Sequence, residues 1–553
     1  MAATSFGHHI PLIYAAVAGV TSHMGLFVHG EWERYAERLA MTALFGPPVL
    51  LAGLAFIQGL SMFWALIITI EMTTGFYVGL YGSMAIYRLF FHSLRSFPGP
   101  VRARLTSFWS MRESVQDFKW YLKVQKLHEE YGDFVRIRPR EISIANVDAI
   151  HDIHSPTTKC VKGPFYDVAY PARSLAMTRD KKFHSQRRRV WDKAFSPKAL
   201  KDYESRVIGH CNDLISQMTA SDSKPVNATD LADYYGFDVM GDLVLGKSFD
   251  MLKTGEAPFI LKQIRENKKT TGWAVCATWT FHLFKILRFA GKGRMTFVEW
   301  CKEQLQERRK KTPSKPDLYT HLNSADEARS KTVNAALMEG DLVQDAELAI
   351  IAGSGTTTSA LAATLYLLAK HPAEQQALYA ELCAQFAPAD PLSHQALVGK
   401  PVLEGVINEA LRLFPPIPSG VQRETPPAGA VIAGRWIPGR TIVSTPTWTL
   451  QRDPRNFTHP TAFLPSRWST YPDLCPRKDA FNPFAAGTYS CVGRPLALME
   501  LRLAVASVVR KFDVRLADAD ESVRKAELEP GFLDCFTWKA PPVDVVFVER
   551  RVC

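Results

Sequence analysis

Signatures of nucleotide and nucleic-acid binding are missing from this chain of 553 residues. The only near match to a dinucleotide fingerprint, Gly353-Ser354-Gly355, lies inside a helical pattern with no strand before it, which excludes a flavin or nicotinamide domain. The net charge is +11, but no basic stripe with interleaved aromatic residues accompanies it, so we predict no nucleic-acid partner. Anionic lipid headgroups and an acidic partner protein fit this charge better.

The chain also lacks a disulfide framework, repeats and low-complexity linkers. Its nine cysteines are odd in number and irregularly spaced, which indicates a reducing compartment. With 47% hydrophobic and 22% charged residues, the composition excludes a disordered chain. Because no repeat or linker follows residue 97, we predict one large domain over residues 97–553.

Residues 1–96 form a second region of different composition. Uncharged runs cover residues 10–28 and 41–60, and a third run over residues 61–86 carries only Glu71. Each run is long enough to cross about 30 Å of hydrocarbon. The first run lacks a basic lead and a clear cleavage site, which argues against a cleaved signal peptide. We therefore expect an N-terminal membrane region with about three transmembrane helices.

Flanking charges predict the orientation of these runs. Basic residues accumulate on the cytoplasmic side of a membrane, and four of them follow the third run: Arg88, Arg95, Arg102 and Arg104. With three spans, the charged segment 31–38 lies on the same side. The alternative is one span plus a hairpin, because Gly46-Pro47-Pro48 is able to make the second run re-entrant.

Helical patterns dominate the large domain, for example over residues 234–245, 360–369 and 496–509. Short β-like runs cover residues 134–137, 142–144, 442–444 and 543–548. The predicted fold class is therefore mainly α with small β-sheets.

One cysteine stands in a distinctive context. Cys491 ends the segment Phe484-Ala485-Ala486-Gly487-Thr488-Tyr489-Ser490-Cys491, and a helical pattern begins near Pro495. The free N–H groups and positive dipole end of a helix stabilise a thiolate, and a thiolate in this position can hold haem iron. Gly487 allows the tight backbone path. The alternative is that Cys491 is an ordinary buried residue, as most cysteines are.

Two further motifs carry charges. Glu409-Ala410-Leu411-Arg412 lies in the helical pattern 403–414, where a spacing of three puts the carboxylate and the guanidinium on one face. Alone, this motif would be an ordinary surface pair. Phe463-Leu464-Pro465-Ser466-Arg467-Trp468 supplies a second arginine.

A fourth motif, Ala352-Gly353-Ser354-Gly355-Thr356-Thr357, lies in an apolar stretch from about Asp345 to Lys370. Asp341 with Gln344 predicts a capping box at the start of this helix. A glycine inside a helix costs about 1 kcal/mol relative to alanine, so the two glycines need a reason. Room for dioxygen between a helix and an iron centre is one such reason.

In their chain order these four motifs resemble the cytochrome P-450 family, and specifically its membrane-bound fungal members. The resemblance covers about residues 97–553 and implies the cytochrome P-450 fold with a thiolate-ligated haem on Cys491. It also implies a buried structural triad of Glu409, Arg412 and Arg467 that fixes the segment leading to Cys491.

Two positions depart from the family pattern. By resemblance, Thr356 is the catalytic threonine whose hydroxyl directs protons to dioxygen. The family usually has Asp or Glu immediately before this threonine, whereas this chain has Gly355. Either water and the hydroxyls of Ser354, Thr356 and Thr357 carry the protons, or less of the oxygen consumed reaches product. Tyr489 stands where an arginine or histidine normally meets a haem propionate, so the positive charge must come from elsewhere.

By resemblance, His184 and Arg188 supply that charge, and Arg423 is a second source. For Arg187 and Arg189, in the same basic run, we favour a solvated basic face. The expected haem-binding residues are Cys491, His184, Arg188, Arg423, Tyr489, Phe484 and Gly487.

The resemblance implies an oxidoreductase that inserts one oxygen atom from O2 into a lipophilic small molecule, with a terpenoid or another secondary metabolite favoured. Electrons would come from NADPH through an NADPH-dependent flavoprotein reductase. The enzyme would lie in the lipid bilayer of the endoplasmic reticulum, with its catalytic domain in the cytosol. The expected pocket residues are Phe165, Tyr166, Ala349, Ala352, Gly353, Thr356, Ile417 to Val421, and Phe536.

Two alternatives remain at this point. One is a haem-thiolate isomerase or dehydratase that needs no reductase, and the other is a non-enzymatic haem-binding membrane protein. The retained Thr356 favours oxygen activation over the first, and the complete set of motifs favours an enzyme over the second.

Overall fold

The computed structural model describes residues 10–284, 292–311, 316–323, 335–387, 390–517 and 531–550. The chain divides into two compact units, which are described separately below. The smaller unit contains residues 1–112, 134–142 and 274–292, and the larger unit contains residues 113–133, 143–273 and 293–553.

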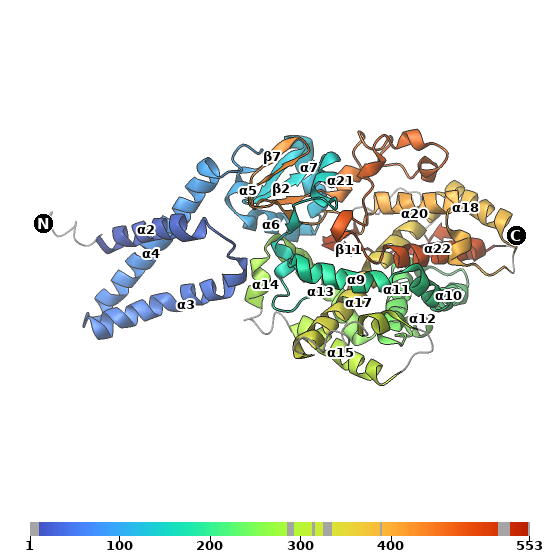
Figure 1. Cartoon of the computed structure of the whole chain (residues 1–553), viewed down its shortest axis with the longest axis horizontal. Helices are drawn as coiled ribbons and strands as arrows, with labels where there is room; N and C mark the ends of the chain where they lie inside the picture. The colour runs from blue at the N-terminus through green and yellow to red at the C-terminus, as the bar shows by residue number, and fades with distance from the viewer. Residues whose placement is uncertain are drawn as a thin grey trace. The chain divides into compact units, whose positions relative to one another are not determined.

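Three apolar helices, drawn in blue in Figure 1, begin the smaller unit. They are α2 (Ile10–Ser22), α3 (Ala36–Ala52) and α4 (Met62–Ile86), and π-helical turns extend them to Phe27, Ile57 and Phe91. The segments Ile10–Phe27, Glu33–Ile57 and Met62–Phe91 are each long and apolar enough to cross a membrane. Pro47 and Pro48 lie inside α3, and the helix continues past both.

Helices α2 and α4 pack closely and run in the same direction. A Cβ on Gly75 would lie 2.4 Å from the carbonyl oxygen of Leu12, and one on Gly79 would lie 2.0 Å from that of Ala16. Farther along both helices, His23 and Ser83 share a hydrogen bond of 2.7 Å. Small residues permit this close backbone approach, as in many membrane helix pairs. Since α2 and α4 run in the same direction, α3, which joins them in the sequence, must carry the chain back in the opposite direction.

The smaller unit also contains α5 (Val101–Leu105), β1 (Phe134–Arg138) and α14 (Trp279–Phe284). Arg140, just after β1, forms ion pairs with Glu31 at 3.2 Å and Glu33 at 3.8 Å. Helix α14 contacts α3 and the short 3-10 helix η2 (Glu33–Tyr35). The loop between α2 and α3 thus lies beside the end of β1.

The larger unit is mostly helical and its sheets are small. Its helices and those that it shares with the smaller unit are α6 (Ser107–Asp117), α7 (Trp120–Tyr131), α8 (Asp148–His154), α9 (Lys181–Ala194), α10 (Pro197–Ala220), α11 (Ala228–Leu245), α12 (Met251–Thr254), α13 (Phe259–Cys276), α15 (Lys292–Arg309), α17 (Ala335–Lys370), α18 (Pro372–Gln385), α19 (His394–Leu397), α20 (Pro401–Leu413), α21 (Thr447–Gln451) and α22 (Arg494–Lys511).

The strands of the described residues form four sheets, and the strand pairs named below are antiparallel. In the larger unit β3 (Val161–Lys162) pairs with β5 (Arg423–Glu424), and β5 pairs with β8 (Ile442–Ser444). The other pairs are β6 (Ala430–Ile432) with β7 (Arg435–Ile437), β12 (Asp544–Glu549) with β4 (Val226–Asn227) and with β9 (Phe512–Leu516), and β10 (Leu533–Cys535) with β11 (Thr537–Lys539). β2 covers Glu141–Ile144. The predicted mainly α class with small sheets is confirmed.

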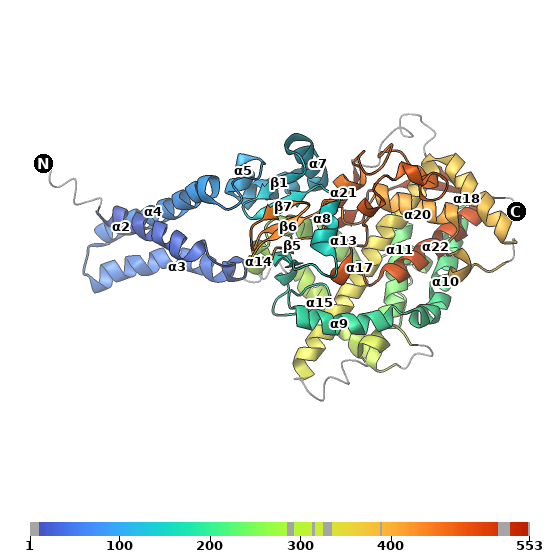
Figure 2. The same cartoon turned by 45° about the horizontal axis from the view of Figure 1, so that its top comes forward.

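Helix α17 is the long helix through the core of the larger unit, visible in yellow in Figure 2. It ends at Lys370 as predicted but begins at Ala335, so the predicted start at Asp341 is wrong. The residues from Ala335 to Glu339 are good helix formers, which is why the helix extends past that apparent cap.

Close packing of α17 on α11 explains one of its two glycines. A Cβ on Gly353 would lie 2.6 Å from the Sδ atom of Met240 on α11. A Cβ on Gly236 of α11 would lie 2.4 Å from Thr358 on α17. Gly353 is half-buried and its Cβ direction faces α11, so close helix packing is one reason for this glycine; its place in the oxygen groove and the substrate pocket stays a prediction.

Candidate active site

The thiol of Cys491 is presented by a tight loop at the start of α22. The backbone N–H of Cys491 donates to the carbonyl of Phe484 at 2.8 Å, and α22 begins at Arg494. Gly487 has φ +65°, and a Cβ there would lie 1.7 Å from the carbonyl oxygen of His154, so only glycine fits. Within the part of the chain that the structure describes, Cys491 is the exposed free cysteine, and the other free cysteines are buried.

Protein atoms crowd Cys491 on all but its open side. This desolvation raises the pKa of the thiol, while the backbone N–H groups of Gly493 and Arg494 and the charges of Arg188 and Arg494 lower it. Arg188 is held in place because it donates to the carbonyl of Ser490 at 2.6 Å. These donors and charges are suited to stabilise the sulfur as a metal-bound thiolate.

A second open surface lies in the middle of α17. Ile351 and Ala352 are exposed and Thr356 is half-buried, although most of the helix after them is buried. The hydroxyl of Thr356 donates to the carbonyl of Ala352 at 2.7 Å. An open thiol and an open helix face within a large buried core fit a flat cofactor that covers both.

A cluster of positive charge surrounds Tyr489. The ring centroid of Tyr489 lies 5.0 Å from the guanidinium of Arg423, 5.1 Å from Nζ of Lys162 and 4.7 Å from the ring of His184. Burial, then the charges of Lys162, Arg188 and Arg423, lower the pKa of His184 to about 3. Burial and the two arginines lower the pKa of Lys162 well below its usual value.

This cluster has an unused donor. Nε of Arg423 is buried and has no hydrogen-bond partner in the described residues. Buried positive charges require a compensating anion, and the two carboxylates of a haem would provide it. The structure thus brings His184, Arg188 and Arg423 close to Tyr489 and Ser490 of the thiolate loop, and their contact with the haem carboxylates stays a prediction. Lys162 was missed, because one lysine in a two-residue strand gives no sequence signal.

Arg187 does not lie on a solvated face, so that prediction is wrong. It is buried and forms an ion pair with Asp345 of α17, whose carboxylate also accepts hydrogen bonds from Trp191 at 2.9 Å and from the backbone of Leu175 at 2.8 Å. Arg187 lies one turn before Trp191 and therefore on the same buried side of α9. Arg189 is exposed, as predicted. The Asp345 contacts attach α9, and with it His184 and Arg188, to α17.

Glu409, Arg412 and Arg467 form a fully buried charge cluster. The carboxylate of Glu409 accepts from Nε of Arg412 and Nε of Arg467, both at 2.9 Å, and from Trp468 at 2.9 Å. The two arginines donate to backbone carbonyls of Gln451, Thr458, His459, Pro460, Ala462 and Leu474. No side-chain surface of the three charged residues is exposed.

Gln451 links this charge cluster to the thiolate loop. Its side-chain nitrogen donates to the carbonyls of Leu411 and Arg412, and its side-chain oxygen accepts from the backbone of Asn482, two residues before Phe484. A disturbance of the buried charges would therefore reach the loop that carries Cys491.

The predicted pocket residues divide into different environments. The rings of Phe165 and Phe536 lie 4.8 Å apart. Tyr166 instead accepts a hydrogen bond from Arg423 at 3.3 Å and therefore belongs to the positive cluster. Ala349 is buried and Ala352 is exposed, while the segment 417–421 is mostly half-buried.

Comparison with known proteins identifies the family to which this chain belongs. A model of the Cytochrome P450 family matches residues 98–545. The chain belongs to this family. It is 39% identical to "Cytochrome P450 monooxygenase nodW" of Hypoxylon pulicicidum over 97% of both chains. It is 32% identical to "Tryprostatin B 6-hydroxylase" of Aspergillus fumigatus over 93% of this chain and 92% of that one.

A solved structure agrees with the fold. "Crystal structure of cytochrome P450DA heme domain" matches 80% of this chain and 95% of its own with a TM-score of 0.66 at 20% identity. The protein is thus a cytochrome P450 monooxygenase, and the family implies a haem with a thiolate ligand. The residues described above fit this group, since they offer one open thiol and a buried positive cluster with a free donor.

Removal of one charge from the buried cluster should be strongly destabilising. Glu409→Ala leaves two buried guanidinium groups without their carboxylate, which typically costs about 3 to 5 kcal/mol. We expect Glu409→Ala and Arg412→Ala to lose most haem-loaded protein, measured as haem absorbance per mole of purified chain. Full haem content with normal turnover in either variant would contradict the structural role of the cluster. Arg189→Ala, at an exposed position, is the matched control.

Proposed function

We propose that this monooxygenase inserts one oxygen atom from dioxygen into a lipophilic small molecule, a terpenoid or another secondary metabolite. Electrons come from NADPH through a membrane-bound flavoprotein reductase. The observation that supports oxygen insertion most directly is the open strip of α17 with Thr356, in a core that also exposes the thiol of Cys491. The name of one relative, "Tryprostatin B 6-hydroxylase", is consistent with this chemistry.

In this proposal the side chains of the site have separate tasks. When bound, a thiolate-ligated haem supplies the reductive activation of dioxygen. Cys491 would hold its iron, and Lys162, Arg423 and Tyr489 would bind its carboxylates. Thr356 moves protons, since its hydroxyl is both donor and acceptor. The paired rings of Phe165 and Phe536 provide an apolar wall for the substrate.

We further propose that residues 1–96 cross the endoplasmic reticulum membrane three times and that residues 97–553 form a cytosolic catalytic domain. The parallel direction of α2 and α4 supports an odd number of crossings. The ion pairs of Arg140 with Glu31 and Glu33 support a cytosolic loop between α2 and α3, as does the basic flank after α4.

The reaction is tested with purified full-length protein, a fungal NADPH-dependent reductase and a panel of terpenoid and aromatic compounds. We expect substrate-dependent NADPH oxidation with an oxygenated product, and a carbon monoxide difference band typical of thiolate-ligated haem. Cys491→Ser should lose both the activity and the band, because an alcohol is a much weaker acid than a thiol and does not supply an anionic ligand. A normal band in Cys491→Ser would show that another residue holds the iron. Product formed without reductase would favour isomerase or dehydratase chemistry.

Thr356→Ala should uncouple NADPH oxidation from product formation. A positioned proton donor contributes roughly 10²- to 10⁴-fold to its step, so its loss favours release of hydrogen peroxide over product. We expect a lower ratio of product formed to NADPH oxidised, with nearly unchanged substrate affinity. Thr356→Ser, which keeps the hydroxyl, should retain most of the ratio. An unchanged ratio in Thr356→Ala would remove this residue from the mechanism.

Membrane topology is tested by protease treatment of sealed microsomes. Three crossings with a cytosolic catalytic domain predict that protease digests everything after about Arg95 and leaves the N-terminus protected. An epitope tag at the N-terminus should become accessible only after detergent is added. Protection of the catalytic domain in intact microsomes would contradict the proposed orientation.

A further inference from the structure

The space beside Gly355, where the family usually has an acid, contains a lysine from another helix. A Cβ on Gly355 would lie 3.3 Å from Nζ of Lys268 and 3.9 Å from its Cε, with no other atom outside its own helix within 4 Å. Lys268 belongs to α13, 87 positions earlier in the chain. The chain therefore lacks the acid but places an ammonium group against the same turn of α17.

Lys268 has few hydrogen-bond and ion-pair partners in this position. Its Nζ donates one long hydrogen bond of 3.4 Å to the carbonyl of Trp538 and forms no ion pair with the residues that the structure describes. The nearby carboxylates are engaged by Arg265, which lies 2.9 Å from Asp233 and also pairs with Asp230. Two of the three N–H donors of Lys268 are thus available to water or to another ligand.

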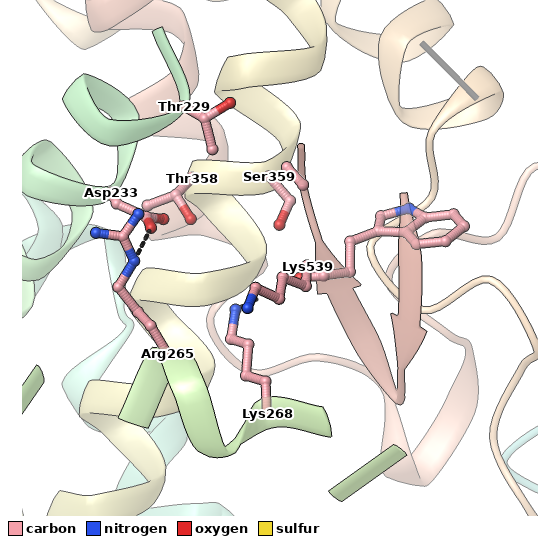
Figure 3. A pocket seen from close by; sticks show the side chains of 9 residues that line it. Thr229, Asp233, Arg265, Lys268, Thr358, Ser359 and Lys539 are labelled. Carbon is pink, nitrogen blue, oxygen red and sulfur yellow. Dashed lines mark hydrogen bonds and ion pairs between the residues drawn. The ribbon is translucent and has the colours of Figure 1, made fainter. Parts of the chain in front are cut away.

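These donors face a polar pocket beside α17. Lys268, Arg265 and Asp233 line it together with Thr358, Ser359 and Lys539, and Figure 3 shows Lys268 reaching from α13 toward α17. On α17, the hydroxyl of Ser359 donates to the carbonyl of Gly355 at 2.7 Å, and that of Thr358 donates to the same carbonyl at 3.2 Å. Both hydroxyl oxygens keep lone pairs that can accept from an ammonium group or from water.

We propose that Lys268 is a positioning residue that provides the proton-donating group beside Thr356, in place of the acid that Gly355 lacks. The proposal rests on the proposed function. Each oxygen insertion takes up dioxygen, two electrons and two protons, and one oxygen atom leaves as water. The electrons come from NADPH. The ammonium of Lys268 releases a proton through water toward the hydroxyl of Thr356, and its Nζ regains a proton from solvent in the pocket.

The charges around Lys268 suit this role. Burial lowers the pKa of Lys268; Asp233 of α11 and Cys535 of β10 oppose this, and Arg265 of α13 and Lys539 of β11 reinforce it. From α17 only the neutral hydroxyls of Thr358 and Ser359 face the pocket in the described residues. An amine with a lowered pKa releases its proton more readily than an ordinary lysine.

The first test measures the ratio of product formed to NADPH oxidised in Lys268→Met, Lys268→Arg and the exposed control Lys262→Met on the same helix. Lys268→Met should lower the ratio at least about tenfold, which is less than the roughly 10²- to 10⁴-fold that a positioned proton donor contributes to its step. Lys268→Arg keeps the charge but holds its proton too tightly to release it, so it should resemble Lys268→Met. A normal ratio in either Lys268 variant would overturn the proposal.

The pH profile of this ratio separates proton donation from structural support. Lysine donates while it is protonated, so in the unmodified enzyme the ratio should fall as the pH rises through the lowered pKa of Lys268. In Lys268→Met this pH step should disappear, whereas Lys262→Met should keep it. A step that persists in Lys268→Met would assign the proton to another group.

The second test requires no turnover. Haem-loaded protein is treated with acetic anhydride over a range of pH, and acetylation of Lys268 and of Lys262 is measured by mass spectrometry. Lys268 should react at lower pH than the exposed Lys262. Gly355→Asp places a carboxylate against Nζ of Lys268, so acetylation of Lys268 should fall about tenfold in this variant, while that of Lys262 stays constant.

Equal acetylation of Lys268 in Gly355→Asp and in the unmodified enzyme would overturn the placement of Lys268. This readout remains valid if Lys268→Met fails to fold. It is also independent of the reductase and of the substrate. A protein that shows the acetylation pattern but forms no oxygenated product would contradict the proposed function and leave the contact between Lys268 and α17 intact.

Discussion

The buried carboxylate of Glu409 is the point on which the thiolate loop depends. Two arginines and a tryptophan donate to it, and the arginines also donate to backbone carbonyls between residues 451 and 474. Because an unpaired buried charge is costly, these groups must remain together. Gln451 transmits this constraint to Asn482, so the loop before Cys491 has a fixed starting point.

The site itself has an excess of positive charge. Lys162 and Arg423 approach the ring of Tyr489, and neither forms an ion pair there in the described part of the chain. Such repulsion destabilises the protein on its own and is relieved by a bound dianion. Haem binding is therefore expected to stabilise the larger unit as well as to complete the site.

Helix α17 connects these features. Asp345, in the first third of the helix, attaches α9 with His184 and Arg188, and the open strip at Ala352 and Thr356 lies in mid-helix. Next to this strip, Gly355 leaves room for Lys268. One helix thus carries the carboxylate that binds α9, the hydroxyl of Thr356 and the glycine against which Lys268 lies.

Local patterns in the sequence determined the helices and strands, the three apolar runs and the spacing that pairs Glu409 with Arg412, because each depends on residues close together in the chain. The thiolate segment was likewise recognisable from contiguous residues. The start of α17 was not, since an apparent cap at Asp341 competes with the helix formers before it.

Only the tertiary structure decided which partner each side chain meets. The burial of Arg187 against Asp345, the contact of Gly353 with Met240, and the approach of Lys268 to Gly355 all join segments far apart in sequence. Periodicity gives the direction of a side chain relative to its own helix. It does not give the neighbour that fills the space on that side, because that neighbour is selected by the packing of the whole domain.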